Sequence, residues 1–288
     1  MDIAGIIEKG HLVSPGNRKP LSFEGDNSAL TDGTNTYGLY DGRVPILLSD
    51  SDWADSYVKD ADRMLSEYSQ SEEDYAPPQV KSSKATLYTD NSHRVQSEFF
   101  DSINKDDLAL SVGGGPIRFD PKLTNVNIQP FPNVDVVGDA HDLPFADNVV
   151  DYAFAGAVFE HLHSPHIAAA ELYRTLKPGG KALMNSPFAF VYHGYPHHYQ
   201  NFTITGHCEL FKREGFRVLD SGVSVGPGAA ITQLMNHFID MYTSGVTKFA
   251  ANSIWRMLAP LIRRVDRNPA NMDSSHFLAA CTYVLVEK

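Results

Sequence analysis

The chain has 288 residues, 42% of them hydrophobic, and a formal net charge of −11 at pH 7. That length is enough for one large domain or two modest ones with a hydrophobic core, and the negative charge argues against nucleic acid as a partner. Cys208 and Cys281 lie far apart, which excludes a disulfide scaffold and a cysteine zinc site. No secretory signal and no run of about 18 apolar residues is recognisable, so we expect a cytoplasmic protein without a transmembrane helix.

The first part of the chain predicts two segments of different character. Residues 1–50 have the pattern of a small β-rich module, in which Asp41-Gly42 between "TYGLY" and "VPILL" is typical of a hairpin turn. Residues 51–105 are polar and predict a helical linker or cap, interrupted by a loop around Pro77-Pro78. At the end of this segment, Val95, Phe99 and Ile103 are spaced as one face of a helix.

Residues 106–288 form the third segment, in which strand and helix patterns alternate. The predicted strands are "LALSV", "NVDVVGDA", "VVDYAFAGAV", "KALMNSPF" and "RVLDSGVSV". One helix is expected to begin at Ser164-Pro165, with serine as N-cap, and another to cover "TGHCELFKREGF". A helical insertion over about 228–266 and a last strand over about 277–287 complete the segment. The alternation predicts an α/β fold with a mostly parallel sheet.

Three glycines, Gly113 to Gly115, end the first of these strands. Ligands of open α/β sheets bind beyond the carboxyl ends of the strands, and glycine lets the backbone approach a ligand closely. A tight turn without a ligand is the alternative. A dinucleotide loop is less favoured, because Pro116 and Ile117 follow the glycines and the G-x-G-x-x-G spacing is absent.

The residues that follow carry a specific resemblance. "GDAHDLPFADNVVDYAFAGAVFEHL" and then "ELYRTLKPGGKALMNSPF" make the region from about 107 to 222 resemble class I S-adenosylmethionine-dependent methyltransferases, of the small-molecule type 11-like group. This resemblance implies a Rossmann-like, doubly wound, mostly parallel sheet of seven strands and S-adenosylmethionine as the cofactor. It also implies the residues that would bind the cofactor: Gly113, Gly114 and Gly115 for methionine and ribose, Asp139, Ala140 and His141 for adenine, and Ala155 and Ala157 beside the sulfonium.

Two features depart from that pattern. Asn127, followed by Ile128, stands where an acidic residue would grip the ribose hydroxyls, and its neutral hydrogen bonds are weaker than charge-assisted ones. About ten residues separate Gly115 from the second strand, which is barely enough for a crossover helix. We therefore expect that helix to be reduced to a turn.

The acceptor side is predicted from the stretch "FVYHGYPHHYQNFT". Methyl transfer needs an aligned nucleophile, and an oxygen acceptor also needs a base. Histidine, with an ordinary pKa of about 6.5, suits that role. We take His193 as the first candidate, with His198, Tyr199 and His161 behind it; the alternative is a polar loop of solvated histidines.

This stretch also resembles an "HGYP.DYWRFT" segment of methyltransferases associated with polysaccharide and natural-product clusters. His197 and His198 replace acidic residues that are common there. Glu160 and His161 follow the strand "VVDYAFAGAV" and are also expected to face the methyl group; the alternative is that Glu160 orients a neighbouring side chain and His161 packs at a helix start. We expect no metal site, because the spacing of His161, His163 and His166 does not suit one helix face.

The flanks carry two further resemblances. Residues 10–50 are similar to the Trm112-like domain, with Ser14 where a metal-binding cysteine would stand, which implies a module without zinc that acts as a lid, a dimer surface or a packing appendage. Trp255, Leu258 and Ile262, beside arginines, resemble an interfacial helix that meets a membrane or a lipid-linked substrate. An ordinary core-facing helix is the favoured alternative.

The sequence thus predicts a methyltransferase that acts on a small organic or saccharide-type acceptor, on oxygen, with a histidine base. The alternatives are a tRNA or protein methyltransferase, suggested by the Trm112-like segment, and a non-catalytic cofactor-binding scaffold, suggested by Asn127. The acceptor and the oligomeric state stay open.

Overall fold

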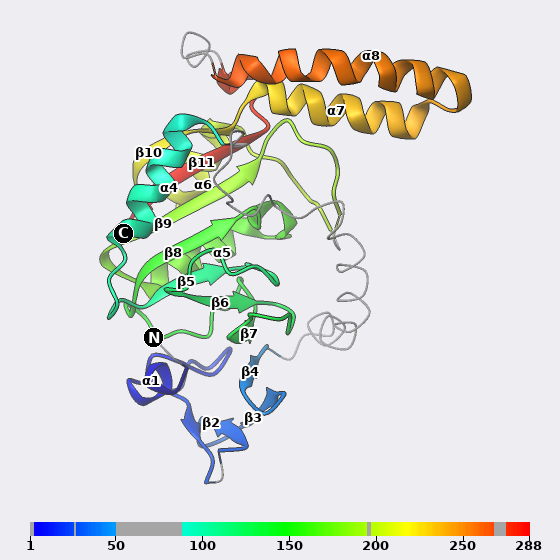
Figure 1. The fold of residues 1–288 in the computed structure, drawn as a ribbon. Helices are drawn as coiled ribbons and strands as arrows, with labels where there is room; N and C mark the ends of the chain where they lie inside the picture. Colours follow the sequence, from blue (N-terminus) through cyan, green and yellow to red (C-terminus); the bar gives the residue numbers. More distant parts are fainter. Residues whose placement is uncertain (1–2, 26, 50–87, 195–196, 268–274) are drawn as a thin grey trace.

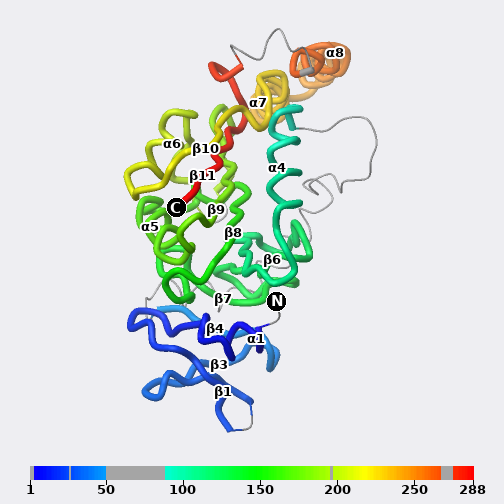
Figure 2. Tube along the Cα trace, turned by 90° about the vertical axis from the view of Figure 1, so that its left-hand side faces the viewer, coloured from blue at the N-terminus to red at the C-terminus, as the bar shows by residue number. Residues whose placement is uncertain are grey.

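The computed structural model describes residues 3–25, 27–49, 88–194, 197–267 and 275–288. In this part of the chain a single sheet lies between helices on its two faces (Figures 1 and 2). The strands follow the order β1-β2-β3-β4-β7-β6-β5-β8-β9-β11-β10. The predicted helix within residues 51–87 and the predicted turn at Pro77-Pro78 lie outside the described residues.

The centre of the sheet is parallel and doubly wound, as predicted. Its five parallel strands are β5 (Ala109–Val112), β6 (Leu123–Asn127), β7 (Val136–Gly138), β8 (Val150–Gly156) and β9 (Leu176–Pro187). Their order β7-β6-β5-β8-β9 reverses between β5 and β8. In such sheets this reversal is the switch point at which ligands bind, beyond the carboxyl ends of the strands. The antiparallel strands β11 (Cys281–Glu287) and β10 (Arg217–Val225) complete that side.

The sheet of the described residues has eleven strands, of which seven, β5 to β11, come from residues 106–288, so the whole sheet is four strands wider than the predicted methyltransferase-like sheet. The N-terminal segment supplies the others: after the short helix α1 (Ile3–Glu8) come β1 (Ser22–Phe23), β2 (Ala29–Thr31), β3 (Thr36–Tyr40) and β4 (Val44–Leu47). β4 pairs in parallel with β7, which satisfies the outer edge of that strand. The hairpin between β3 and β4 is confirmed, because Asp41 and Gly42 both have positive φ, as a type I′ turn requires.

No helix connects β5 to β6, so the expectation of a shortened crossover is confirmed. Residues 113–122 instead form turns. The face left open is covered by α4 (Asp90–Ser102), which precedes β5 and is capped by the Thr89 side chain. Its predicted apolar positions are buried against strand residues such as Leu123 and Phe154. Helix α4, which precedes β5, thus covers the face of the sheet that a crossover helix between β5 and β6 would otherwise cover.

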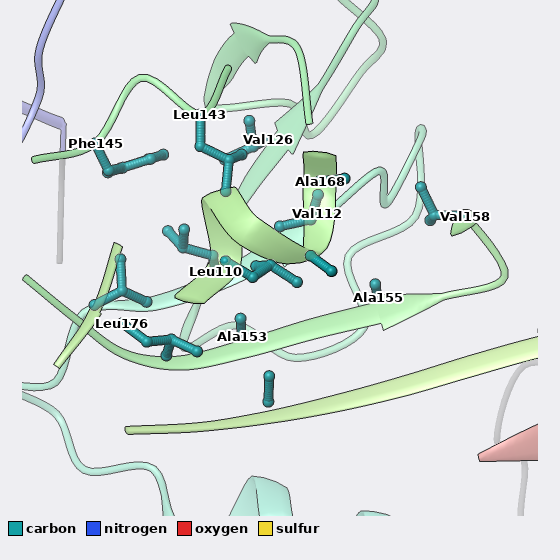
Figure 3. Close-up of a cluster of buried hydrophobic side chains, with 14 of the residues drawn as sticks. Leu110, Val112, Val126, Leu143, Phe145, Ala153, Ala155, Val158, Ala168 and Leu176 are labelled. Atoms are coloured by element: carbon teal, nitrogen blue, oxygen red, sulfur yellow. The ribbon is translucent and has the colours of Figure 1, made fainter. Parts of the chain in front are cut away.

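The opposite face is covered by α5 (Pro165–Thr175) and α6 (Ile204–Lys212), and Figure 3 shows strand side chains meeting Ala168 there. Pro165 lies in the first turn of α5, as expected. Ser164 occupies the predicted N-cap position, but its hydroxyl makes no cap hydrogen bond and lies 2.8 Å from His163 Nδ1 instead. The "LKPGG" segment that follows α5 belongs to β9, which it joins through a register shift.

The C-terminal extension is a pair of helices that projects beyond the sheet (Figures 1 and 2). α7 (Pro227–Tyr242) packs along α8 (Gly245–Arg263), and the 3-10 turns η2 (Arg264–Arg267) and η4 (Ser275–Phe277) precede β11. Trp255 is the buried residue of α8. The preference for a core-facing helix was therefore wrong, because most apolar side chains of α8 face solvent. Within the described residues, no helix is both long enough and apolar enough to cross a bilayer.

Candidate active site

The glycine corner, Gly113 to Gly115, lies at the carboxyl end of β5 and is shaped by contacts within the protein. Gly113 has φ +71° and Gly115 has φ +56°, values that favour glycine. A Cβ on Gly113 would lie 2.6 Å from both methyl groups of Val158, and a Cβ on Gly114 would lie 2.5 Å from Asn125 Oδ1. A Cβ on Gly115 would meet no atom within 4 Å. Two of the glycines are therefore required by packing, and the third borders open space.

Asn127 is buried at the end of β6 and holds this corner in place. Its Oδ1 accepts a hydrogen bond from Gly115 N at 3.2 Å, and its Nδ2 donates to the Gln129 carbonyl at 3.1 Å. Ile128, the next residue, is half-buried. The side chain predicted to contact a ribose thus bonds to the glycine corner beside it.

Asp139, Ala140 and His141 follow β7 at the same edge of the sheet. Asp139 is buried, and its Oδ1 accepts from His141 N at 2.9 Å and lies 2.8 Å from His141 Nδ1. The His141 ring stacks on His163, with centroids 4.3 Å apart. These contacts give the segment a fixed shape.

The end of β8 carries a strained turn. Ala155 is buried within the strand, whereas Ala157 is exposed and has φ +63°, a region that costs an alanine about 1–3 kcal/mol. The Ala157 amide donates to the Asn185 carbonyl at 2.9 Å, which holds the turn. Such strain is found preferentially at ligand sites.

A cluster of Glu160, His161 and His193 lies beyond the ends of β8 and β9. Glu160 and His161 belong to the 3-10 turn η1 (Phe159–His161), and His193 lies in the loop between β9 and α6. Glu160 is fully buried, and neither carboxylate oxygen has a hydrogen-bond partner among the described residues. Its Oε1 lies 3.7 Å from His161 Nε2 and 3.6 Å from His193 Nε2.

Backbone carbonyls fix both imidazole rings of this cluster. His161 Nδ1 lies 2.6 Å from the His197 carbonyl, and His193 Nδ1 lies 3.0 Å from the Val191 carbonyl. A carbonyl only accepts, so each Nδ1 carries the proton and each Nε2 faces Glu160. Burial lowers the pKa of His161. Burial also disfavours the His193 imidazolium, but the Glu160 carboxylate and the Val191 carbonyl outweigh it and raise the pKa of His193.

The other predicted acceptor-side residues lie around this cluster. His198 accepts from His193 N at 3.2 Å, and its Nε2 lies 2.6 Å from Asn201 Oδ1. Tyr199 is exposed; its amide donates to the Glu160 carbonyl, and its ring contacts His163 and His197. Tyr195 lies outside the described residues.

Sequence reasoning did not bring Glu160 and His193 together. It considered His161 with His163 and His166, whereas the structure joins His161 to Glu160 and His193. The sequence did contain a usable signal. Glu160 and His161 follow β8, and His193 follows the neighbouring parallel strand β9. Because the carboxyl ends of parallel strands lie at one edge of the sheet, these side chains could have been expected to meet.

Comparison with known proteins identifies part of the chain. Residues 118–184 match the family described as "Methyltransferase domain". This part of the chain is thus similar to a methyltransferase domain. The match begins in the connection between β5 and β6 and ends within β9. It includes Asn127, Asp139 and Glu160, but neither the glycine corner nor His193.

Individual relatives agree with this assignment. The chain is 36% identical over 86 residues to demethylmenaquinone methyltransferase of Staphylococcus carnosus, covering 26% of this chain and 36% of that protein. It is 28% identical over 133 residues to a "probable S-adenosylmethionine-dependent methyltransferase" of Mycolicibacterium smegmatis, covering 43% and 51%. The chain thus spans about half or less of these relatives' length.

Among solved structures, the chain is similar to a phosphoethanolamine N-methyltransferase of Haemonchus contortus in complex with phosphomonomethylethanolamine and S-adenosylhomocysteine. The TM-score is 0.42 at 16% identity, over 69% of this chain and 52% of that one.

Proposed function

We propose that this protein transfers a methyl group from S-adenosylmethionine to a small organic or saccharide-type acceptor, on oxygen. The observation that carries the proposal is that residues 118–184, which match a methyltransferase domain, belong to a sheet whose carboxyl-end edge carries the glycine corner, just before the match, and the cluster of Glu160, His161 and His193. An activated methyl donor supplies the electrophile, so the protein has to align the acceptor and exclude water.

The cofactor is proposed to lie along the carboxyl ends of β7, β6, β5 and β8. The open space beside Gly115 and the strained turn at Ala157 support this placement, because both leave main chain accessible at the switch point. The proposed cofactor-binding residues are Gly113, Gly114, Gly115, Asn127, Ile128, Asp139, Ala140, His141, Ala155 and Ala157.

The acceptor is proposed to bind against the histidine cluster beyond β8 and β9. A neutral hydroxyl is a poor nucleophile, so its proton has to be removed or its acidity increased. His193 is the first choice for the residue that controls this proton, because it is partly exposed and directly opposes the buried Glu160. His161, His198 and Tyr199 surround it and shape the acceptor site.

The flanking segments are proposed to assist. The N-terminal module, residues 1–50, is Trm112-like but zinc-free, which fits the Ser14 hydroxyl accepting from Lys19 N at 3.2 Å where a ligand cysteine would stand. The resemblance of the acceptor-side loop supports a role in natural product or polysaccharide biosynthesis.

The projecting helices are proposed to rest on a lipid surface that carries the acceptor. Val246, Ile254, Met257, Leu258 and Leu261 are exposed, and at about 100° per residue they occupy roughly one third of the circumference of α8. Arg256 and Arg263 are exposed on the same helix, outside this stripe, and the positive charge they give to α8 favours an anionic membrane. Exposed apolar residues on the neighbouring helix α7 extend the surface: Leu234, Phe238, Met241 and Tyr242.

A vesicle assay tests this contact. The full chain is expected to float with vesicles that contain anionic phospholipid, and Met257→Ser with Leu261→Ser is expected to reduce the bound fraction at unchanged stability. Equal flotation of the double variant, or no flotation of the wild type, would remove the lipid surface from the proposal.

The central test is binding and turnover. Calorimetry with S-adenosylmethionine and S-adenosylhomocysteine is expected to show one site per chain, and no binding would end the enzyme proposal. A labelled methyl group is then offered together with extracts fractionated into small molecules, saccharides, tRNA and protein. Label in tRNA or protein would replace the proposed acceptor class, and cofactor binding without transfer to any fraction would indicate a scaffold.

A further inference from the structure

We propose that Glu160, His161 and His193 form a binding site for a divalent transition-metal ion, with zinc as the ion that the ligand set suits best. Two imidazole nitrogens and one carboxylate oxygen are the protein ligands of many catalytic zinc sites, which leave the remaining position to water or substrate. The three ligand atoms come from η1 and from the β9–α6 loop, and all lie within 4.8 Å of one another. Binding of the metal does not depend on the proposed methyl transfer, whereas its chemical role rests on it.

The buried Glu160 carboxylate is the first argument. The side chain is 0% exposed, and neither oxygen has a hydrogen-bond partner among the described residues. An unpaired carboxylate in such a place is costly by several kcal/mol, so buried charges are generally paired or bound to a metal. No lysine or arginine of the described residues forms an ion pair with Glu160; the groups that face it are the two histidines.

The orientation of those histidines is the second argument. Each Nδ1 bonds to a backbone carbonyl, of His197 for one ring and of Val191 for the other. In the neutral ring this leaves an unprotonated Nε2 with its lone pair toward Glu160. Metal-ligating histidines use this arrangement, in which an acceptor behind the ring fixes the tautomer and the other nitrogen binds the ion.

The distances are the third argument. Separations of 3.6 and 3.7 Å from Glu160 Oε1 to the two Nε2 atoms are too long for hydrogen bonds. Ligand atoms around a tetrahedral zinc lie about 3.3–3.4 Å apart, given bonds of about 2.0–2.1 Å. Each glutamate–histidine pair would therefore have to shorten by only a few tenths of an ångström, and the two Nε2 atoms, which lie within 4.8 Å of each other, would approach as the rings turn toward an ion.

The surroundings leave one side of the site accessible. The side chains of His161 and His193 are 23% and 27% exposed, whereas Glu160 lies behind them. The loop that carries His193 is tied to η1 by the hydrogen bond from Tyr199 N to the Glu160 carbonyl. The buried ligand is thus fixed, and an ion would keep a free coordination position toward solvent, where an acceptor could bind.

Under the proposed function, the ion would acidify an acceptor hydroxyl that it binds. The hydroxyl would give its proton to solvent water. The oxygen would form a bond to the methyl carbon while the carbon–sulfur bond breaks, and sulfur would keep that electron pair as the thioether of S-adenosylhomocysteine. His193 would then hold the ion that acidifies the hydroxyl, and would not itself accept the proton.

The experiment uses the full chain, treated with a chelator and then dialysed. Titration calorimetry with zinc chloride is expected to give one site per chain, and cobalt(II) is expected to give the visible absorption of a low-coordinate site. Glu160→Gln and His193→Asn should each weaken zinc binding by at least about 100-fold. His166→Asn, which changes an exposed histidine on α5 outside the cluster, is the matched control and should leave it unchanged.

The outcomes separate the metal site from the enzyme proposal. No zinc binding by the wild type, or binding that the Glu160 and His193 variants leave intact, would overturn the metal site; the cluster would then be a carboxylate paired with a protonated His193. Should Glu160→Gln fail to fold, His193→Asn and the cobalt spectrum still decide. S-adenosylmethionine binding is measured on the same samples. A protein that binds S-adenosylmethionine but no zinc would contradict the metal site alone, and a protein that binds zinc but no S-adenosylmethionine would contradict the proposed methyl transfer alone.

Discussion

Replacing Gly113 by alanine tests why the first strand ends on glycine. The new Cβ would occupy the left-handed region at φ +71° and lie 2.6 Å from Cγ1 and Cγ2 of Val158. The backbone conformation costs an L-residue about 1–2 kcal/mol, and forcing extra volume into a packed site costs about 1–3 kcal/mol. Gly113→Ala should therefore lower the free energy of unfolding by about 2–5 kcal/mol.

Gly115→Ala is the matched control, because its φ is +56° but its Cβ would meet open space. Only the backbone cost of about 1–2 kcal/mol should remain. Urea unfolding followed by circular dichroism measures both values, and Gly113→Ala with Val158→Ala should recover about 1–3 kcal/mol in a double-mutant cycle. Equal destabilisation by the two single variants, or zero coupling to Val158, would refute the packing explanation.

Other variants test the pH dependence and the ion pairs of the fold. Complete burial lowers the pKa of His207 to about 3, so the unfolded chain, with a pKa of about 6.5, takes up the proton first and stability falls as the pH drops below that value. At pH 5 this amounts to about 2 kcal/mol, and His207→Gln should flatten that part of a stability profile measured in urea; an unchanged slope would contradict the assignment. Arg174→Ala leaves the buried Glu171 without its main partner and should cost about 3–5 kcal/mol. Arg18→Ala, which removes a half-exposed partner of the same carboxylate, should cost about 1 kcal/mol or less in the same assay. Similar losses of stability for the two variants would show that the burial of the arginine does not determine how much its ion pair with Glu171 contributes.

Local patterns were sufficient for the parallel core. The spacing of apolar residues and the position of Pro165 predicted its strands and helices, and the short chain after Gly115 predicted the missing crossover helix. These features are determined by residues that are close together in the sequence, so they can be predicted from short sequence patterns.

Contacts between distant segments were not predictable in this way. The pairing of β4 with β7 joins residues about ninety positions apart, and nothing in the "VPILL" pattern states which strand edge it will meet. The meeting of Glu160 with His193 depends on the relative placement of two loops. The exposure of α8 was misjudged because an apolar stripe at helical spacing does not reveal whether a partner surface exists.

The junction between β4 and β7 makes the first fifty residues part of the sheet itself. A shortened protein lacking them would present the bare hydrogen-bonding groups of β7 and the newly uncovered side chains of Phe131, Val134 and Val137 to water. Such an edge recruits strands from other molecules. By pairing with β7, the N-terminal segment therefore protects the protein against self-association through this strand edge.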